Sequence, residues 1–169
     1  MKNFTPYLLI GIILTFVSFV VFGIFSDDSI TLKGNTRIVN VNSKDVKQIL
    51  TDIEQTKKWS LLFKNDDLEF QTDEMLNEVE WRKKGNTEWI KLNAKNNAGD
   101  IVYTISTKGQ DDTIMEFALE QDNKDVEVQC RYKIGVPLVF RFFKKSMKER
   151  LTKDLNSNLI SLKQFIESK

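Results

Sequence analysis

The sequence contains no histidine, one cysteine and two prolines among its 169 residues. The absence of histidine removes the side chain that serves most often as a general base and as a ligand of transition metals. Cys130 alone cannot form an internal disulfide, and without a histidine it makes a poor nucleophile, so we expect it to be a small core residue. No glycine-rich phosphate loop is present. We therefore predict no catalytic residues, no metal ligands and no cofactor.

Charges of the two signs balance over most of the chain. Lys2 is one of the 25 basic residues and the only charge before Ser26, so the remainder carries 24 basic and 24 acidic residues. A neutral domain argues against nucleic-acid binding. Residues 66–80 are rich in acids and residues 131–153 are rich in bases, and we interpret both runs as solvated faces.

The longest apolar run extends over 22 residues, from Phe4 to Phe25, without a charge. As a helix it would be about 33 Å long, which matches a bilayer core of about 30 Å. A cleaved signal peptide is one alternative, but the run is longer than a signal-peptide core and lacks a small-x-small cleavage site. A buried core helix is another, but the run has no polar face. We predict a transmembrane helix in an anchor of residues 1–26, followed by a domain of residues 27–169.

The residues beside this run bear on where the domain lies. Lys2 precedes the run and Asp27 and Asp28 follow it, which favours a domain outside the cytoplasm, although two basic residues further on count the other way. Residues 26–29 alone separate the run from the first predicted strand, a reach of about 14 Å when extended. The domain is therefore expected at the membrane surface.

Alternation and turn residues predict an antiparallel meander. The first strand is Ile30–Val41, with a bulge at Gly34. Ser43 is the expected N-cap of a short helix that continues through Ile53, and a second short helix follows over Gln55–Trp59. Six more strands are separated by turn signals; they are Leu68–Gln71, Asn77–Arg82, Glu88–Lys95, Asp100–Thr107, Thr113–Glu120 and Asp125–Gly135.

A long helix is predicted at the end of the chain. After Pro137 there is neither proline nor glycine, and apolar residues recur at spacings of three and four from Phe143 to Ile166. At roughly 25 residues the helix would be about 38 Å long, so it needs a wide apolar surface against it. The dry face of the predicted sheet supplies that surface.

Two segments carry a resemblance to a known family. Val39–Lys64, in which a strand leads through a capped helix to Asp52 and then Trp59, resembles the opening signature of the START/SRPBCC superfamily. Gly135–Ser168 resembles the closing strand end, proline and helix of its membrane-anchored, polyketide cyclase/dehydrase-like branch. The resemblance implies an α+β helix-grip fold, in which a curved sheet of about seven strands surrounds a long C-terminal helix. Because this fold hosts carriers, cyclases, hormone receptors and chaperone cofactors, it implies no single activity.

The residues expected between sheet and helix are mostly aromatic, and they would either fill a core or line a cavity. The resemblance favours a cavity, because a curved sheet and a long helix rarely fill the space between them. The ligand-cavity candidates are Trp59, Phe63, Trp81, Tyr103, Phe117, Tyr132, Met147 and Leu151. Lys144 and Lys148 lie within or beside the apolar arc of the helix. They are candidates for a cavity mouth that attracts an anionic head group, unless the helix begins later or the lysines snorkel.

The expected function is therefore that of a membrane-tethered module that binds a hydrophobic small molecule or lipid. An interaction or structural module with a filled core is the alternative. A cyclase- or hydrolase-type enzyme is the third reading, in which Tyr103 and Tyr132 would supply inward hydroxyls. The sequence predicts no particular protein partner.

Overall fold

The structure is a computed structural model that describes residues 26–169 except 74 and 98, together with residues 12, 14, 15, 17, 18 and 21. All but six of the 22 residues of the predicted membrane helix, Phe4–Phe25, therefore lie outside the described residues. Among the residues that are described, no helix is both long enough and apolar enough to cross a membrane.

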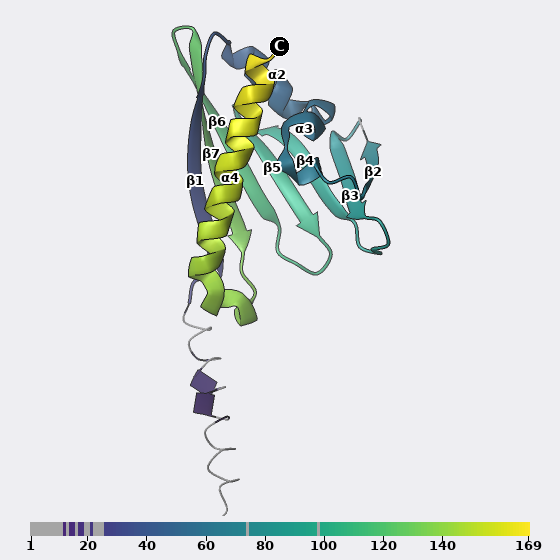
Figure 1. The fold of residues 1–169 in the computed structure, drawn as a ribbon, viewed down its shortest axis with the longest axis vertical. Helices are drawn as coiled ribbons and strands as arrows, with labels where there is room; N and C mark the ends of the chain where they lie inside the picture. The colour runs from purple at the N-terminus through teal and green to yellow at the C-terminus, as the bar shows by residue number, and fades with distance from the viewer. Residues whose placement is uncertain are drawn as a thin grey trace, which may run out of the picture.

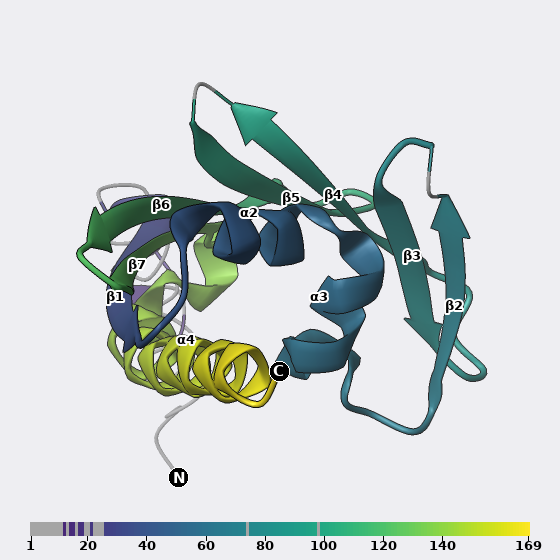
Figure 2. The same ribbon diagram turned by 90° about the horizontal axis from the view of Figure 1, so that it is seen from above.

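The described part is an α+β unit in which one antiparallel sheet curves around helices (Figures 1 and 2). The strands lie in the order β1-β7-β6-β5-β4-β3-β2, so the first and last strands of the chain are neighbours. Their bounds are β1 (Ser29–Ile38), β2 (Leu68–Asp73), β3 (Glu78–Lys83), β4 (Ile90–Asn97), β5 (Asp100–Thr107), β6 (Thr113–Asp122) and β7 (Asp125–Gly135). The seven predicted strands and the helix-grip arrangement are confirmed.

The helices follow β1 and β7 along the chain, and the longest of them lies against the inner face of this sheet. They are α2 (Ser43–Thr51), α3 (Ile53–Trp59), the 3₁₀-helix η1 (Leu61–Phe63), the 3₁₀-helix η2 (Leu138–Phe143) and α4 (Lys144–Glu167). The prediction of one helix from Ser43 through Ile53 is wrong. Asp52 is extended, and its carboxylate accepts hydrogen bonds from the amides two and three residues later, so it ends α2 and caps α3. Asn42, rather than Ser43, caps α2.

The C-terminal helix has the predicted length but a later start. α4 is 24 residues long and begins at Lys144, because the six residues after Pro137 form η2 instead. Phe143 therefore precedes the helix and is exposed, although the spacing placed it on the apolar face. Farther along α4, Leu155, Leu159 and Leu162 are buried as predicted.

β1 also departs from the prediction. It ends at Ile38 rather than Val41, since Asn40 adopts the left-handed conformation with a φ of 54°. No bulge occurs at Gly34, because β1 and β7 stay in register from Ser29 opposite Gly135 to Ile38 opposite Val126. Gly34 instead lies beneath α4, where an added Cβ would be 2.8 Å from Leu159 Cδ1. The missing side chain lets the helix approach the strand.

The molecule has two ends that differ in character. We call the end where β1 begins the proximal end; it holds η2 and the start of α4, and in Figure 1 it is the lower end. We call the opposite end distal; it holds α2, the turn between β6 and β7, and the last turn of α4.

Side chains from the sheet fix α2 at the distal end. The last carbonyls of a helix have no donor within the helix. Here the Leu50 carbonyl accepts a hydrogen bond from the Tyr103 hydroxyl at 2.6 Å, and the Thr51 carbonyl accepts one from Asn77 Nδ2 at 2.7 Å. The Thr56 hydroxyl lies 2.9 Å from the Tyr103 oxygen and completes a buried polar cluster. α2 is thereby joined to β5 and to the turn before β3.

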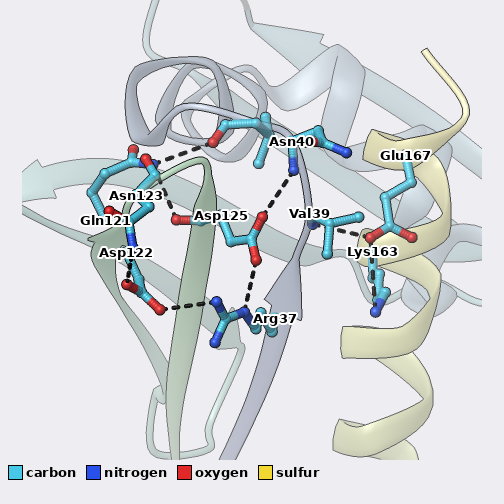
Figure 3. A network of polar contacts seen from close by, with 10 residues as sticks. Arg37, Val39, Asn40, Gln121, Asp122, Asn123, Asp125, Lys163 and Glu167 are labelled. Atoms are coloured by element: carbon cyan, nitrogen blue, oxygen red, sulfur yellow. Dashed lines mark hydrogen bonds and ion pairs between the residues drawn. The ribbon is translucent and has the colours of Figure 1, made fainter.

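A polar network closes the distal end (Figure 3). Arg37 at the end of β1 donates to Asp125 and Asp122 on either side of the β6–β7 turn, each at 2.9 Å. Asp125 also accepts a hydrogen bond from the amide of Asn40, and Glu167 of α4 accepts one from the amide of Val39. The network thus binds four elements together at the point where the chain leaves the sheet.

Candidate ligand-binding cleft

An apolar cleft lies between the sheet and α4 on the proximal side of the core. Its volume is about 160 Å³. It is lined by η1, three strands and one stripe of α4, through Leu62, Ile105, Met115, Tyr132, Leu151, Asp154, Leu155 and Asn158. A liquid water occupies about 30 Å³, so the cleft has room for roughly five water-sized groups and is smaller than most pockets for drug-sized ligands.

The cleft exists because α4 is covered unevenly along its length. Leu155, Leu159 and Leu162 are buried against β1 and the core, whereas Met147 and Leu151, nearer the start of the helix, are only partly buried. In the sheet, Tyr132 pairs with Leu32, three residues from the start of β1, so the cleft lies in the proximal half of the strands. The space between sheet and helix is therefore filled distally and left partly open proximally.

Hydrogen bonds from α4 hold the roof of the cleft. Asn158 Oδ1 accepts from the amide of Leu61 at 2.8 Å, which places the neighbouring Leu62 over the cleft. One turn further along the helix, the buried hydroxyl of Ser161 donates to the Trp59 carbonyl at 2.7 Å and accepts from Lys64 at 2.9 Å. These bonds fix α3 and η1 to α4, so the roof has one position.

Tyr132 supplies the hydroxyl inside the cleft. Within the described part of the chain its hydroxyl has no hydrogen-bond partner. Burial, and then the nearby negative charge of Asp154, raise the pKa of this hydroxyl above the ordinary tyrosine value, so at neutral pH it is protonated, as any unperturbed tyrosine is. A protonated and unpartnered phenol can donate a hydrogen bond to a carbonyl or ether oxygen of a ligand.

The two inward tyrosines, Tyr103 and Tyr132, therefore differ in whether the hydroxyl has a hydrogen-bond partner among the described residues. Tyr103 is fully buried, and its hydroxyl is already bonded to Leu50 and Thr56. Burial raises its pKa far above the ordinary tyrosine value. Tyr103 thus serves the structure, whereas Tyr132 faces the cleft.

Most of the other cavity candidates pack against one another. Phe117 makes edge-to-face contacts with Tyr103 at 5.0 Å and with Trp59 at 6.4 Å between ring centroids, and Phe63 makes one with Trp81 at 5.0 Å. All five rings are buried in the core, and none of them lines the cleft. The Trp59 Nε1 donor is buried without an acceptor among the described residues. Of the eight candidates, Tyr132 and Leu151 line the cleft, and Met147 lies one turn before Leu151.

The two lysines proposed for a cavity mouth do not line the cleft. Lys144 is the first residue of α4, and its Nζ lies 3.3 Å from Asp27 Oδ2 in the segment before β1. Lys148 is exposed one turn later. The charged residue that does line the cleft is Asp154. Asp154 and Asn158 were not singled out from the sequence, although they share the i, i+3, i+4, i+7 stripe of α4 with Leu151 and Leu155.

Other features of the described chain offer little chemistry. No cluster of three or more Cys, Asp or Glu side chains in the described part could hold a metal ion. Cys130 is buried, and burial raises the pKa of its thiol to about 12, so it stays protonated and unreactive. A hollow of about 520 Å³ lies on the outer face of the sheet and is lined mainly by charged and amide side chains of β1, β5, β6 and β7.

No model of a protein family matches the sequence, and no curated protein matches it as a relative. Solved structures do match the fold. A protein of Thermus thermophilus has a TM-score of 0.62 at 12% identity, over 82% of this chain and 98% of that one. The Zhui aromatase/cyclase of Streptomyces sp. R1128 has a TM-score of 0.58 at 10% identity, over 80% of this chain and 92% of that one. A protein of Chromobacterium violaceum has a TM-score of 0.56 at 13% identity, over 83% and 99%. The chain thus shares its helix-grip fold with these proteins, and identities this low carry the fold alone.

Proposed function

We propose that the protein is a membrane-tethered helix-grip module that takes a hydrophobic small molecule, or the apolar part of a lipid, into the cleft between η1, β5–β7 and α4. The observation that carries the proposal is the cleft itself, which combines an apolar lining with one protonated hydroxyl that has no partner among the described residues. Such a combination is typical of sites that accept an apolar body and orient one polar atom. At about 160 Å³ the cleft suits one end of a chain or a small ring system.

The tether and its orientation are part of the proposal. Phe4–Phe25 is long enough and apolar enough to span a bilayer, and β1 begins at Ser29, four residues after that run ends. Lys2 before the run and the aspartates after it favour a domain outside the cytoplasm. Protease treatment of intact cells and of inverted membrane vesicles tests this orientation: cleavage of the domain only in inverted vesicles would contradict it.

Photolabelling tests the cleft in the full chain. The probe is a palmitic acid analogue with a diazirine near the end of its chain, added to membranes that hold the protein. We expect cross-links to η1 and to the α4 stripe around Leu151 and Asn158. Leu151→Trp should abolish them by filling the cleft, whereas Ile160→Trp, on the exposed face of the same helix, should not. Labelling that is unchanged by Leu151→Trp would overturn the proposal.

A second candidate function follows from the hollow on the outer sheet face. Its side chains carry both signs of charge, and Glu116 and Arg131 lie 3.8 Å apart across β6 and β7. A protein with a filled aromatic core could use this face to bind a partner protein. Cross-linking in cells that is lost on Arg131→Glu, together with absent photolabelling of the cleft, would favour this function over the first.

A further inference from the structure

An apolar surface is exposed at the proximal end of the described part of the chain. None of the six residues of η2 is buried. Val139 is 68% exposed, Phe143 60%, Phe140 51% and Leu138 39%. Four large apolar side chains within six residues are unusual on a solvated surface, where apolar groups normally occur singly.

The backbone around η2 is fixed against the segment that follows the apolar run. Arg141 donates to the carbonyls of Ser26 and Val136, each at 3.2 Å, and the amide of Val136 donates to the carbonyl of Asp28 at 2.6 Å. Lys144 pairs with Asp27. η2 therefore lies beside residues 26–28, directly after Phe25, the last residue of the 22-residue apolar run.

Basic residues predominate in the chain around and after this surface. From Gly135 to Lys153 the chain has one acidic residue, Glu149, and six basic ones, which are Arg141, Lys144, Lys145, Lys148, Arg150 and Lys153. The first turn of α4 contains no acidic residue. Asp27 and Asp28 lie close by, and Lys144 offsets the first of them. Exposed aromatic rings flanked by lysines are the composition of segments that rest in the interface of an anionic bilayer.

We propose that η2 docks into the interface of the bilayer, with Val139, Phe140 and Phe143 among the acyl chains and Lys145 and Lys148 at anionic head groups. The proposal rests on the membrane tether of the proposed function, and it adds an orientation of the domain. Leu151 is seven residues from the start of α4, about 10 Å along the helix, so docking holds the cleft within reach of the bilayer surface. A lipid tail could then pass from the bilayer to the cleft without crossing water.

Depth-dependent quenching tests the docking in the full chain. Val139→Cys in a Cys130→Ala background carries the fluorophore NBD, and the protein is reconstituted in phosphatidylcholine vesicles with about a quarter phosphatidylglycerol. Interfacial segments lie about 5–10 Å deep, so doxyl-labelled lipids should remove about half of the NBD emission at position 139. NBD at Lys124→Cys, in the distal turn, should keep its emission.

A matched pair of charge variants tests the lysines. Lys145→Gln with Lys148→Gln should reduce quenching at position 139 in the anionic vesicles. Lys44→Gln with Lys47→Gln, the same charge change at the distal end, should leave it unchanged.

Flotation of the full chain with the vesicles separates the two proposals. A chain that does not float contradicts the tether and the docking together. A chain that floats while NBD at position 139 is quenched no more than NBD at position 124 overturns the docking and leaves the tether standing. Disulfide cross-linking between two copies through Val139→Cys, in place of quenching, would likewise overturn the docking and assign the surface to a dimer.

Discussion

The distal and proximal ends of the molecule are built from the same sheet and the same helix, yet they are completed in opposite ways. Distally, polar side chains satisfy the backbone where the chain turns: Tyr103 and Asn77 bind the last carbonyls of α2, and Asp125 and Glu167 bind amides after β1. Proximally, the half-buried stretch of α4 borders the cleft, and η2 exposes its apolar side chains.

Along α4, the residues that pack the core and the residues that border the cleft occupy successive stretches that overlap at Leu155. The distal stretch of α4, from Leu155 to Ile166, supplies core packing. The proximal stretch, from Met147 to Leu151, is only partly covered and so can accept another molecule. Elements with few buried contacts contribute least to global stability and are free to serve binding.

The largest loss of stability is expected from a buried leucine in the distal stretch of α4, and a much smaller loss from a leucine at the cleft. Leu162→Ala empties a fully buried site and should lower the free energy of unfolding by about 2–5 kcal/mol. Leu151→Ala, at the cleft, should cost about 1 kcal/mol, because the side chain is partly exposed already. Urea denaturation of the full chain in a mild detergent measures both. Equal losses would mean that the proximal stretch of α4 is as firmly packed as the distal one.

The hydroxyls of Tyr103 and Tyr132 should contribute differently to the free energy of unfolding. Tyr103→Phe leaves the Leu50 carbonyl without its buried donor, although the Thr56 hydroxyl keeps its bond to the Asp52 carbonyl, and should cost about 1–3 kcal/mol. Tyr132→Phe removes a hydroxyl that has no partner among the described residues, so the free energy of unfolding should change by less than about 0.5 kcal/mol. Urea denaturation of the full chain in a mild detergent measures both changes. A large loss with Tyr132→Phe would show that its hydroxyl has a structural partner after all.

The helices and strands themselves were predicted better from the sequence than their ends or the cleft between them, for a physical reason. The strands and the buried face of α4 follow from alternation and from spacings of three and four, which are local properties of the chain. The buried aromatic residues were identified because large rings with strand or helix periodicity nearly always lie inside. What the sequence did not decide was whether those rings fill the core or line a cavity, since that depends on how strands far apart in sequence bring the rings together.

The errors share this origin. Gly34 was interpreted through its backbone freedom, but its position depends on the approach of Leu159 from the other end of the chain. Phe143 was assigned to the buried face of the helix because it continues the spacing of four, but it precedes α4, belongs to η2 and is exposed. Asp154 and Asn158 were passed over because polar residues on a helix are solvated by default. Their place on the stripe of Leu151 and Leu155 was a signal that could have singled them out.

The smallest effect is expected from acid at the distal network. The amide of Asn40, and then the guanidinium of Arg37, hold the pKa of Asp125 below its ordinary value. A lowered pKa in the folded state means that the stabilisation is present above the unfolded value of about 3.9 and is lost as the pH falls through the folded value. The melting temperature should therefore fall below about pH 4 more steeply for the unchanged chain than for Asp125→Asn. The acid slope of Arg37→Gln, which keeps the Asn40 hydrogen bond, should lie between those of the other two chains.

Identical acid slopes for all three chains would mean that the network drawn in Figure 3 holds the β6–β7 turn in place without stabilising the fold. In that case the stability of the distal end would come from the packing of Leu162 and its neighbours and from the hydrogen bonds of Tyr103 and Asn77 to α2.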